Sequence, residues 1–199
     1  MDRAEIKRSL TGAWRLFIGK ADALRYFDTS VDGFWRSFRA IILVAPLYGL
    51  TALADRHDML TDANPIDDFS NGQFWAAKAL TLALDWVTLP LLLAVIADFI
   101  GIRRGYTALI VARNWATVLM LIPFAGIALL DLAGIGTPNS LVLPSLLALI
   151  ATFRMSYMIA RRTLGATPDV SVAFVVLDFL VSLAIVLAAD HLFGIAGVP

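Results

Sequence analysis

Apolar residues run through the chain in five long blocks, with polar and charged residues gathered between them. The blocks cover residues 34–54, 74–102, 106–130, 141–160 and 170–189. Each is about as long as a helix must be to cross a hydrocarbon layer of roughly 30 Å. Strands of an outer-membrane barrel would instead alternate over about ten positions. We therefore predict an all-α polytopic membrane protein with five transmembrane helices, which form one transmembrane domain over residues 34–199.

The amino-terminal segment, residues 1–33, combines many charges with apolar residues at helical spacing. Leu10, Trp14 and Phe17 fall on one helical face, as in an amphipathic helix that lies in the membrane interface. Trp14, Phe17 and, in the first block, Trp35 are the expected interfacial anchors. The pattern also fits a helix packed on the protein's own bundle, because amphipathicity does not separate the two. The segment lacks the features of a signal peptide, so we expect it to stay on the mature protein.

Composition supports the membrane interpretation. Of 199 residues, 59% are apolar and 16% are charged, whereas an ordinary soluble domain has about 45 to 50% apolar and about 25% charged residues. This balance argues against a soluble enzyme. The net charge is zero, which gives no indication of nucleic-acid binding. The chain has no cysteine, so it has neither a thiolate nucleophile nor a disulfide framework.

The distribution of charge predicts an orientation. Twelve basic residues lie in the amino-terminal segment through Arg39 and in the links that follow the second and fourth blocks, which carry Arg103-Arg104 and Arg161-Arg162. The link after the first block instead carries the acidic residues Asp55, Asp58, Asp62, Asp67 and Asp68 with Arg56. By the positive-inside rule, the amino terminus faces the cytoplasm and the carboxyl terminus faces outward. We expect a bacterial-type inner membrane.

Ionisable side chains within the blocks are the candidates for chemistry, because a charge at a helix centre costs about 2.5 to 3.5 kcal/mol on insertion scales. Folding the second and third blocks about Arg103-Arg104 places Asp98 level with Arg113, and the next hairpin places Arg154 level with Asp178. We predict these two intramembrane charge pairs. They serve either as structural bridges or as a switch or proton path.

Asp85 and Lys78 form the candidate ion pathway. They lie seven residues apart, on one helical face but about 10 Å apart along the axis, which is too far for a direct bond. Asp85 is nearest the bilayer midplane, with no cation expected at its level, and is neutral, hydrated or bonded to Thr81. Intramembrane carboxylates often mark ion pathways.

No catalytic, cofactor-binding or metal site is predicted. His57 and His191 each stand beside aspartates, but a lone histidine at an exposed position is more typical of a solvated surface than of a metal site. The chain has no glycine-rich phosphate loop, nucleophile elbow or zinc-protease motif.

The segment Phe27-Asp28-Thr29-Ser30-Val31-Asp32-Gly33-Phe34-Trp35-Arg36-Ser37-Phe38, together with Ile102-Arg103-Arg104-Gly105-Tyr106, resembles bacterial proteins grouped with the Ypt-interacting-protein (Yip) family. The resemblance extends to five closely spaced spans, a cytosolic amino-terminal segment and an outward carboxyl terminus. It implies that architecture. Eukaryotic members are implied to bind Rab-type GTPases and to organise membranes, and no binding residue transfers to this chain.

On these grounds the expected function is that of a non-enzymatic inner-membrane organising or interaction protein. Its expected partners are the lipid bilayer and either another membrane protein or a second copy of the chain. The alternatives are an accessory subunit of a larger membrane complex and a small ion- or solute-coupled transporter that uses Asp85 and Lys78. A transporter predicts a cavity that reaches Asp85, whereas an organiser predicts closed packing around the charges.

Overall fold

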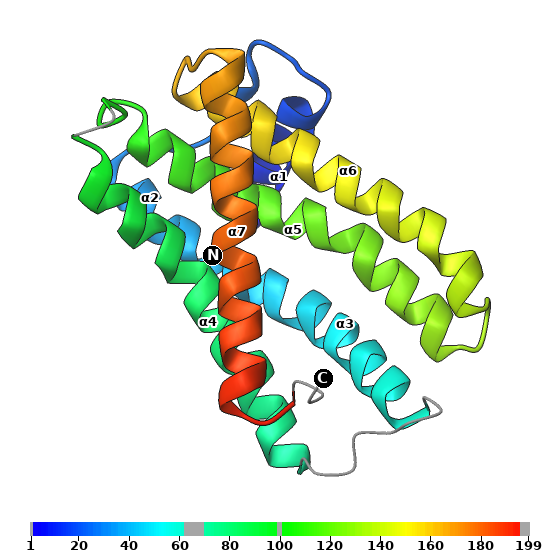
Figure 1. The fold of residues 1–199 in the computed structure, drawn as a ribbon. Helices are drawn as coiled ribbons and strands as arrows, with labels where there is room; N and C mark the ends of the chain where they lie inside the picture. Colours follow the sequence, from blue (N-terminus) through cyan, green and yellow to red (C-terminus); the bar gives the residue numbers. More distant parts are fainter. Residues whose placement is uncertain (1, 62–69, 99–100, 196–199) are drawn as a thin grey trace.

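The computed structural model describes residues 2–61, 70–98 and 101–195, and all regular structure in these ranges is helical. The helices, listed in chain order, are α1 (Arg3–Phe17), η1 (Ala23–Tyr26), α2 (Val31–Ser37), η2 (Phe38–Ala40), α3 (Ile41–Thr61), α4 (Asn71–Ile96), α5 (Tyr106–Leu132), α6 (Pro138–Thr163) and α7 (Pro168–Leu192). Figure 1 shows their arrangement.

Five helical segments of the described residues are long and apolar enough to cross a membrane, which confirms the predicted all-α fold and the five long apolar helices expected of it. They are Val31–Thr61, Asn71–Ile96, Tyr106–Leu132, Asn139–Thr163 and Pro168–Leu192. The first joins α2, η2 and α3 into one unit. The second ends at Ile96, six residues before the end of the apolar block, and this difference matters for the charged residues below.

Local sequence explains where the long helices begin. Ser70 and Gln73 form a capping box at the start of α4, and Thr137 and Ser140 form another at α6. In each box the two residues satisfy each other's backbone N–H groups, which a helix start otherwise leaves unpaired. Pro168 opens α7 at a first-turn position, where proline's missing N–H costs nothing.

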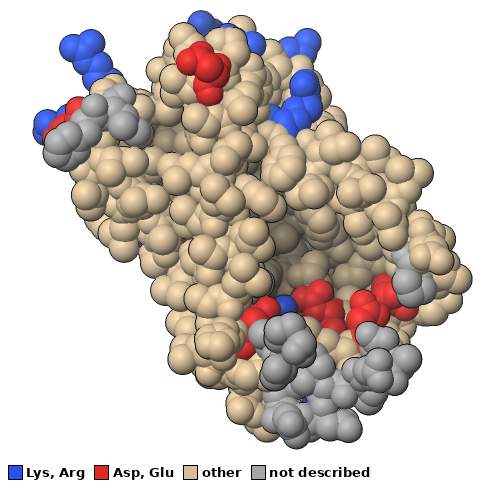
Figure 2. Space-filling view, in the orientation of Figure 1, with Lys and Arg blue, Asp and Glu red and all other residues tan. Residues whose placement is uncertain are grey.

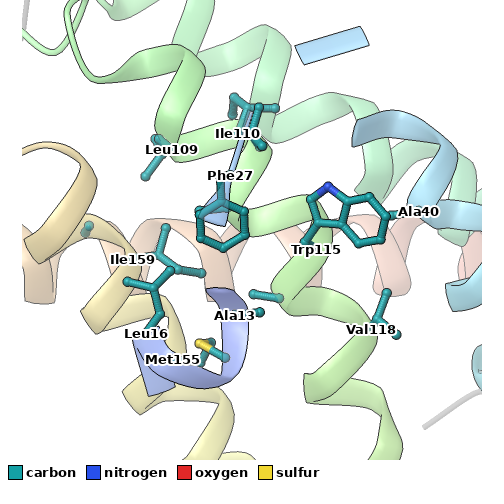
Figure 3. Packing of buried hydrophobic residues seen from close by; sticks show 14 of the residues in the cluster. Ala13, Leu16, Phe27, Ala40, Leu109, Ile110, Trp115, Val118, Met155 and Ile159 are labelled. Carbon is teal, nitrogen blue, oxygen red and sulfur yellow. The ribbon is translucent and has the colours of Figure 1, made fainter. Parts of the chain in front are cut away.

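Helix α5 is the centre of the fold. It packs most extensively against α3 and α6 and also contacts α1 and α2, whereas α4 packs mainly on α7. In Figure 1, α7 crosses in front of the other helices, and α6 runs beside α5. Trp115, Ile110 and Leu109 of α5 are fully or almost fully buried and join Ile159 of α6 in the main apolar core (Figure 3).

The amino-terminal helix α1 packs on the protein's own bundle. Its Gly12, Ala13 and Leu16 are buried, and α1 contacts α5 and α6. Gly12 is required there, because a Cβ atom would lie 2.7 Å from the Tyr26 Cβ. The opposite face is exposed and includes Trp14.

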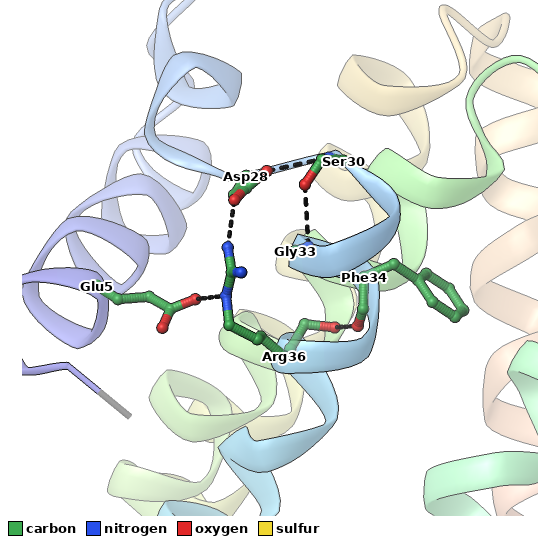
Figure 4. Close-up of polar contacts among 7 residues, drawn as sticks. Glu5, Asp28, Ser30, Gly33, Phe34 and Arg36 are labelled. Carbon is green, nitrogen blue, oxygen red and sulfur yellow. Dashed lines mark hydrogen bonds and ion pairs between the residues drawn. The ribbon is translucent and has the colours of Figure 1, made fainter.

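A polar network ties α1 to the start of the first span (Figure 4). Arg36 of α2 donates to Glu5 of α1 at 3.0 Å and also to Asp28, and the Ser30 hydroxyl accepts from the Gly33 amide at 3.0 Å. Hydrogen bonds from Ser30, together with the Arg36 charge, hold the pKa of the Asp28 carboxyl below its usual range. The network joins α1 to the segment in which the first span begins.

Candidate functional site

Arg113 of α5 lies at the centre of a charge cluster inside the helical bundle. Its guanidinium donates to Asp178 Oδ1 of α7 at 3.1 Å and forms an ion pair with Asp85 Oδ2 of α4 at 3.5 Å. Arg113 itself is only 6% exposed. One cation therefore connects three helices through two carboxylates.

Two serine hydroxyls complete the cluster. Ser156 of α6 donates to Asp178 Oδ2 at 3.2 Å, and Ser182 of α7, one turn beyond Asp178, donates to Asp85 Oδ1. Each carboxylate thus accepts one hydrogen bond from a hydroxyl and also faces the guanidinium. Hydrogen bonding and ion pairing offset part of the cost of removing these charges from water.

The cluster forms part of the wall of a cavity of about 210 Å³. Asp85, Arg113 and Asp178 share this wall with Ser156 and Ser182, and with apolar residues of α5, α6 and α7 that include Met120, Leu121, Phe124, Leu149, Phe153 and Phe179. Figure 2 shows the molecule hollowed between α7 and the α5–α6 pair.

A second hollow, of about 540 Å³, adjoins the first and carries three carboxylates. Asp55 and Asp58 of α3 and Asp131 of α5 line it, and both hollows share Phe124 and Leu149. In Figure 2, acidic side chains gather at the lower end of the hollowed region, with a basic side chain among them, while most basic side chains lie at the top of the molecule, where acidic side chains are also visible. The cavity therefore leads from the charge cluster toward the acidic end of the molecule.

Toward the basic end, the bundle is closed by packed apolar side chains. Ile110 of α5, Ile159 of α6 and Phe174 of α7 lie roughly one turn from Arg113, Ser156 and Asp178, respectively, in the direction of the arginine-rich links. All three are buried in the main core. These buried side chains lie between the cluster and the basic end.

The basic end is built from both arginine-rich links. Gly105 lies so close to the α6–α7 link that a Cβ atom there would be 2.6 Å from the Thr163 carbonyl oxygen. Arg162 donates to the Gly19 carbonyl at 2.9 Å and so joins the same link to the segment after α1. The two predicted basic links therefore lie together at one end of the molecule.

The predicted partners of the intramembrane charges are wrong. Asp98 pairs with Arg103 at 3.4 Å, not with Arg113. Arg154 lies over the Phe17 ring of α1, 5.6 Å from its centre, and not beside Asp178. The structure instead brings Asp178 to Arg113.

The helix ends explain the first error. Since α4 ends at Ile96 and α5 begins at Tyr106, the hairpin turns earlier than the arginine pair. Counting from these ends places Arg113 level with Leu89, one turn from Asp85, and leaves Asp98 outside α4. The expectation that no cation lies at the level of Asp85 is therefore wrong. Asp85 pairs with Arg113 and accepts a hydrogen bond from Ser182, not from Thr81.

Rotation explains the second error. Counting from Thr163 and Pro168 still gives Arg154 nearly the same distance from the link as Asp178. The two side chains, however, point to different neighbours, α1 and α5. Asn114 shows the same effect, because it follows Arg113 directly but donates to Ser37 of α2 at 2.9 Å, away from the cluster.

The candidate ion pathway is divided between two sites. Asp85 belongs to the cluster, whereas Lys78 pairs with Asp55 at 2.8 Å near the acidic end. Asp62, Asp67 and Asp68, which also contributed to the predicted acidic side, lie outside the described residues.

The predicted anchors occupy two kinds of position. Trp14 and Trp35 are 55% and 66% exposed. Phe17 is partly buried between Arg154 and the Trp14 ring, whose centroid is 5.6 Å from that of Phe17.

In the part of the chain that the structure describes, no group of three or more His, Cys, Asp or Glu residues is arranged to hold a metal ion.

Comparisons with known proteins add no assignment: no family model, no curated protein and no solved structure matches this chain.

Proposed function

We propose that the protein is a small ion- or solute-coupled transporter that takes up one positive charge at the Asp85–Arg113–Asp178 cluster. The observation that carries this proposal is the cavity at Asp85, which adjoins the acidic hollow, while buried apolar side chains lie on the side of the basic end. A cavity at this residue is the feature expected of a transporter, whereas an organising protein was expected to pack tightly around its charges.

The charge balance of the cluster supports the same function. Two carboxylates face one guanidinium, so the ionised cluster carries one excess negative charge. An uncompensated charge is costly in the interior of a membrane protein. Binding a proton or a cation neutralises the cluster, and coupling between such binding and helix movement is what an ion-coupled transporter requires.

The membrane placement is part of the proposal. The basic end, with the amino terminus and both arginine-rich links, faces the cytoplasm of a bacterial-type inner membrane, and the acidic end and carboxyl terminus face outward. Helix α1 then lies at the cytoplasmic interface with Trp14 toward lipid. With this placement the acidic hollow that adjoins the cavity lies on the outer side, and the proposed state is outward-facing.

Flux measurements in proteoliposomes test this function. Purified protein is reconstituted, the membrane potential is clamped, and a proton or Na⁺ gradient is imposed while a dye trapped inside reports pH or Na⁺. We expect gradient-dependent uptake that is lost in Asp85→Asn and retained in the matched control Asp98→Asn, whose exposed carboxylate is not among the residues that line the cavity. Uptake no faster than in protein-free liposomes under both gradients contradicts the proposal.

A second candidate function is the organising or interaction role that the Yip resemblance implies. It is favoured by Trp14 and Trp35, which are large, exposed aromatic residues on α1 and α2. Such residues anchor helices at membrane interfaces and serve as contact points for partners. Under this function the chain acts with lipid, with a second copy or as an accessory subunit of a larger complex.

Depth-dependent quenching by brominated lipids distinguishes these surroundings. Comparison of the full chain with Trp14→Phe isolates the Trp14 signal. If quenching of Trp14 is strongest with bromine near the headgroups, the result supports interfacial anchoring. If lipid quenchers do not reach Trp14 in native membranes, the result indicates that a protein partner covers it.

A further inference from the structure

We infer that the cavity binds a small organic ammonium ion, with the charged group at Asp85 and the carbon body against aromatic side chains. This inference rests on the proposed uptake of one positive charge and names the chemical class of the substrate. It follows from the free acceptor capacity of the carboxylates, the composition of the wall and the size of the cavity.

The carboxylates retain hydrogen-bonding capacity toward the cavity. The Asp85 side chain is 31% exposed and that of Asp178 is 17% exposed, whereas Arg113 is almost fully buried behind them. Each carboxylate oxygen can accept two hydrogen bonds. Asp178 Oδ1 already accepts two from Arg113, whereas Asp178 Oδ2 accepts one from Ser156 and Asp85 Oδ1 accepts one from Ser182. An ammonium group entering the cavity can therefore donate to the accessible carboxylate oxygens.

Aromatic rings face the same space. Phe124 of α5, Phe153 of α6 and Phe179 of α7 line the cavity together with the carboxylates. Phe153 and Phe179 pack edge to face, with centroids 5.5 Å apart and an interplanar angle of 90°. Aromatic faces attract cations, and this attraction strengthens where water is excluded. Carboxylate and aromatic groups together are the combination that recognises an organic cation.

The wall and volume favour an organic cation over an inorganic one. Hard metal cations require a shell of about six or more oxygen ligands, whereas much of this wall is carbon from Met120, Leu121 and the phenylalanines. An amine with an apolar body replaces its lost hydration with contacts to that wall. The volume of about 210 Å³ lies below the range of about 300 to 1,000 Å³ typical of drug-sized ligands, so the body is small, such as a single ring.

The approach to the cavity has the matching charge. Asp55, Asp58 and Asp131 line the adjoining hollow, and Lys78 pairs with Asp55. A cleft lined by carboxylates concentrates cations near its mouth. An organic cation thus meets an acidic entrance before it reaches the Asp85 carboxylate.

Calorimetric titration of the full chain in mild detergent tests the inference. The probe is phenethylammonium, with phenethyl alcohol as a neutral analogue of nearly the same shape and NaCl as the inorganic comparison. We expect saturable binding of phenethylammonium and no saturable binding of phenethyl alcohol. Because the neutral analogue keeps the ring, this difference isolates the contribution of the positive charge.

Two variants assign the binding to the cavity. Asp85→Asn should weaken phenethylammonium binding by more than about tenfold, since it removes the charged acceptor, while Asp98→Asn should leave binding unchanged. Phe179→Leu keeps apolar bulk but removes the ring, and should weaken binding by about fivefold, as expected for a cation–π contact. Thermal unfolding of each variant confirms that it folds.

The outcomes separate this inference from the proposed function. Saturable Na⁺ binding, or proton-driven flux, without phenethylammonium binding overturns the organic-cation assignment and leaves the uptake of positive charge standing. Equal binding of phenethylammonium and phenethyl alcohol also overturns it, since the site then recognises only apolar bulk. Failure of both flux and binding overturns both proposals.

Discussion

Arg113 of α5 donates to Asp178 of α7 at 3.1 Å and so links two helices that are not consecutive in the chain. The same guanidinium is the only charged partner that the described residues offer within ion-pair distance of Asp85. One side chain thus supplies both a link between these helices and the counter-charge of the carboxylates in the cavity wall.

The first prediction concerns this shared cation. Arg113→Gln leaves two carboxylates without their counter-charge and should destabilise the protein by about 3 to 5 kcal/mol, the cost typical of breaking a buried pair. Adding Asp178→Asn removes one of those carboxylates, so the double variant should be more stable than Arg113→Gln alone. Denaturant unfolding in detergent measures both. Additive losses would show that the two residues are not coupled.

The second prediction concerns the pair at the end of α4. Asp98 and Arg103 are 70% and 82% exposed, and exposed pairs contribute about 0 to 1 kcal/mol. Asp98→Asn should therefore change the free energy of unfolding by less than about 1 kcal/mol in the same assay. A loss as large as that of Arg113→Gln would indicate that Asp98 is buried against a partner.

The third prediction concerns the entry to the first span. A Cβ atom on Gly33 would lie 2.2 Å from the Asp28 carbonyl oxygen, and backbone cannot yield as a flexible side chain does. Gly33→Ala should destabilise by about 1 to 3 kcal/mol, the usual cost of overpacking. Gly126→Ala is the matched control, because open space surrounds that position. It should be neutral or stabilising by up to about 1 kcal/mol. Equal effects at both glycines would contradict the close contact.

The fourth prediction concerns orientation. The chain has no cysteine, so a single cysteine can be introduced at Thr61 near the acidic end or at Thr163 near the basic end. A membrane-impermeant thiol reagent added to intact cells should label Thr61→Cys and spare Thr163→Cys. The reverse pattern would invert the proposed topology.

The helical architecture could be predicted because continuous apolar blocks have few other solutions in a bilayer, where each backbone polar group must be bonded within its own helix. The helix at the amino terminus followed the spacing of Leu10, Trp14 and Phe17, and α1 spans all three. Its packing against α5 and α6 was one of two alternatives, because amphipathicity reports a face and not what covers it.

The charge cluster could be predicted only in part. Depth along the membrane follows from counting residues, and this placed Arg154 near the level of Asp178. The rotation of each helix and the residue at which α4 ends depend on tertiary packing, and these decide that Arg113 meets Asp85 and Asp178. Ser156 and Ser182 carry no sequence signal of their own, since serine is common in membrane helices. The one indication in the sequence is that Ser182 lies one helical turn from Asp178.

Access of water to the cluster from the acidic end is the central requirement of the proposed function. Ser182→Cys places a thiol on the cavity wall with almost no change in shape, and Leu91→Cys, on an exposed apolar position of α4, serves as a lipid-facing control. A charged methanethiosulfonate reagent, which reacts in water, is applied to either side of oriented membranes. We expect Ser182→Cys to be modified from the outer side only and Leu91→Cys to be unmodified. If the reagent applied to the outer side leaves Ser182→Cys unmodified, this result contradicts a water-filled path to Asp85.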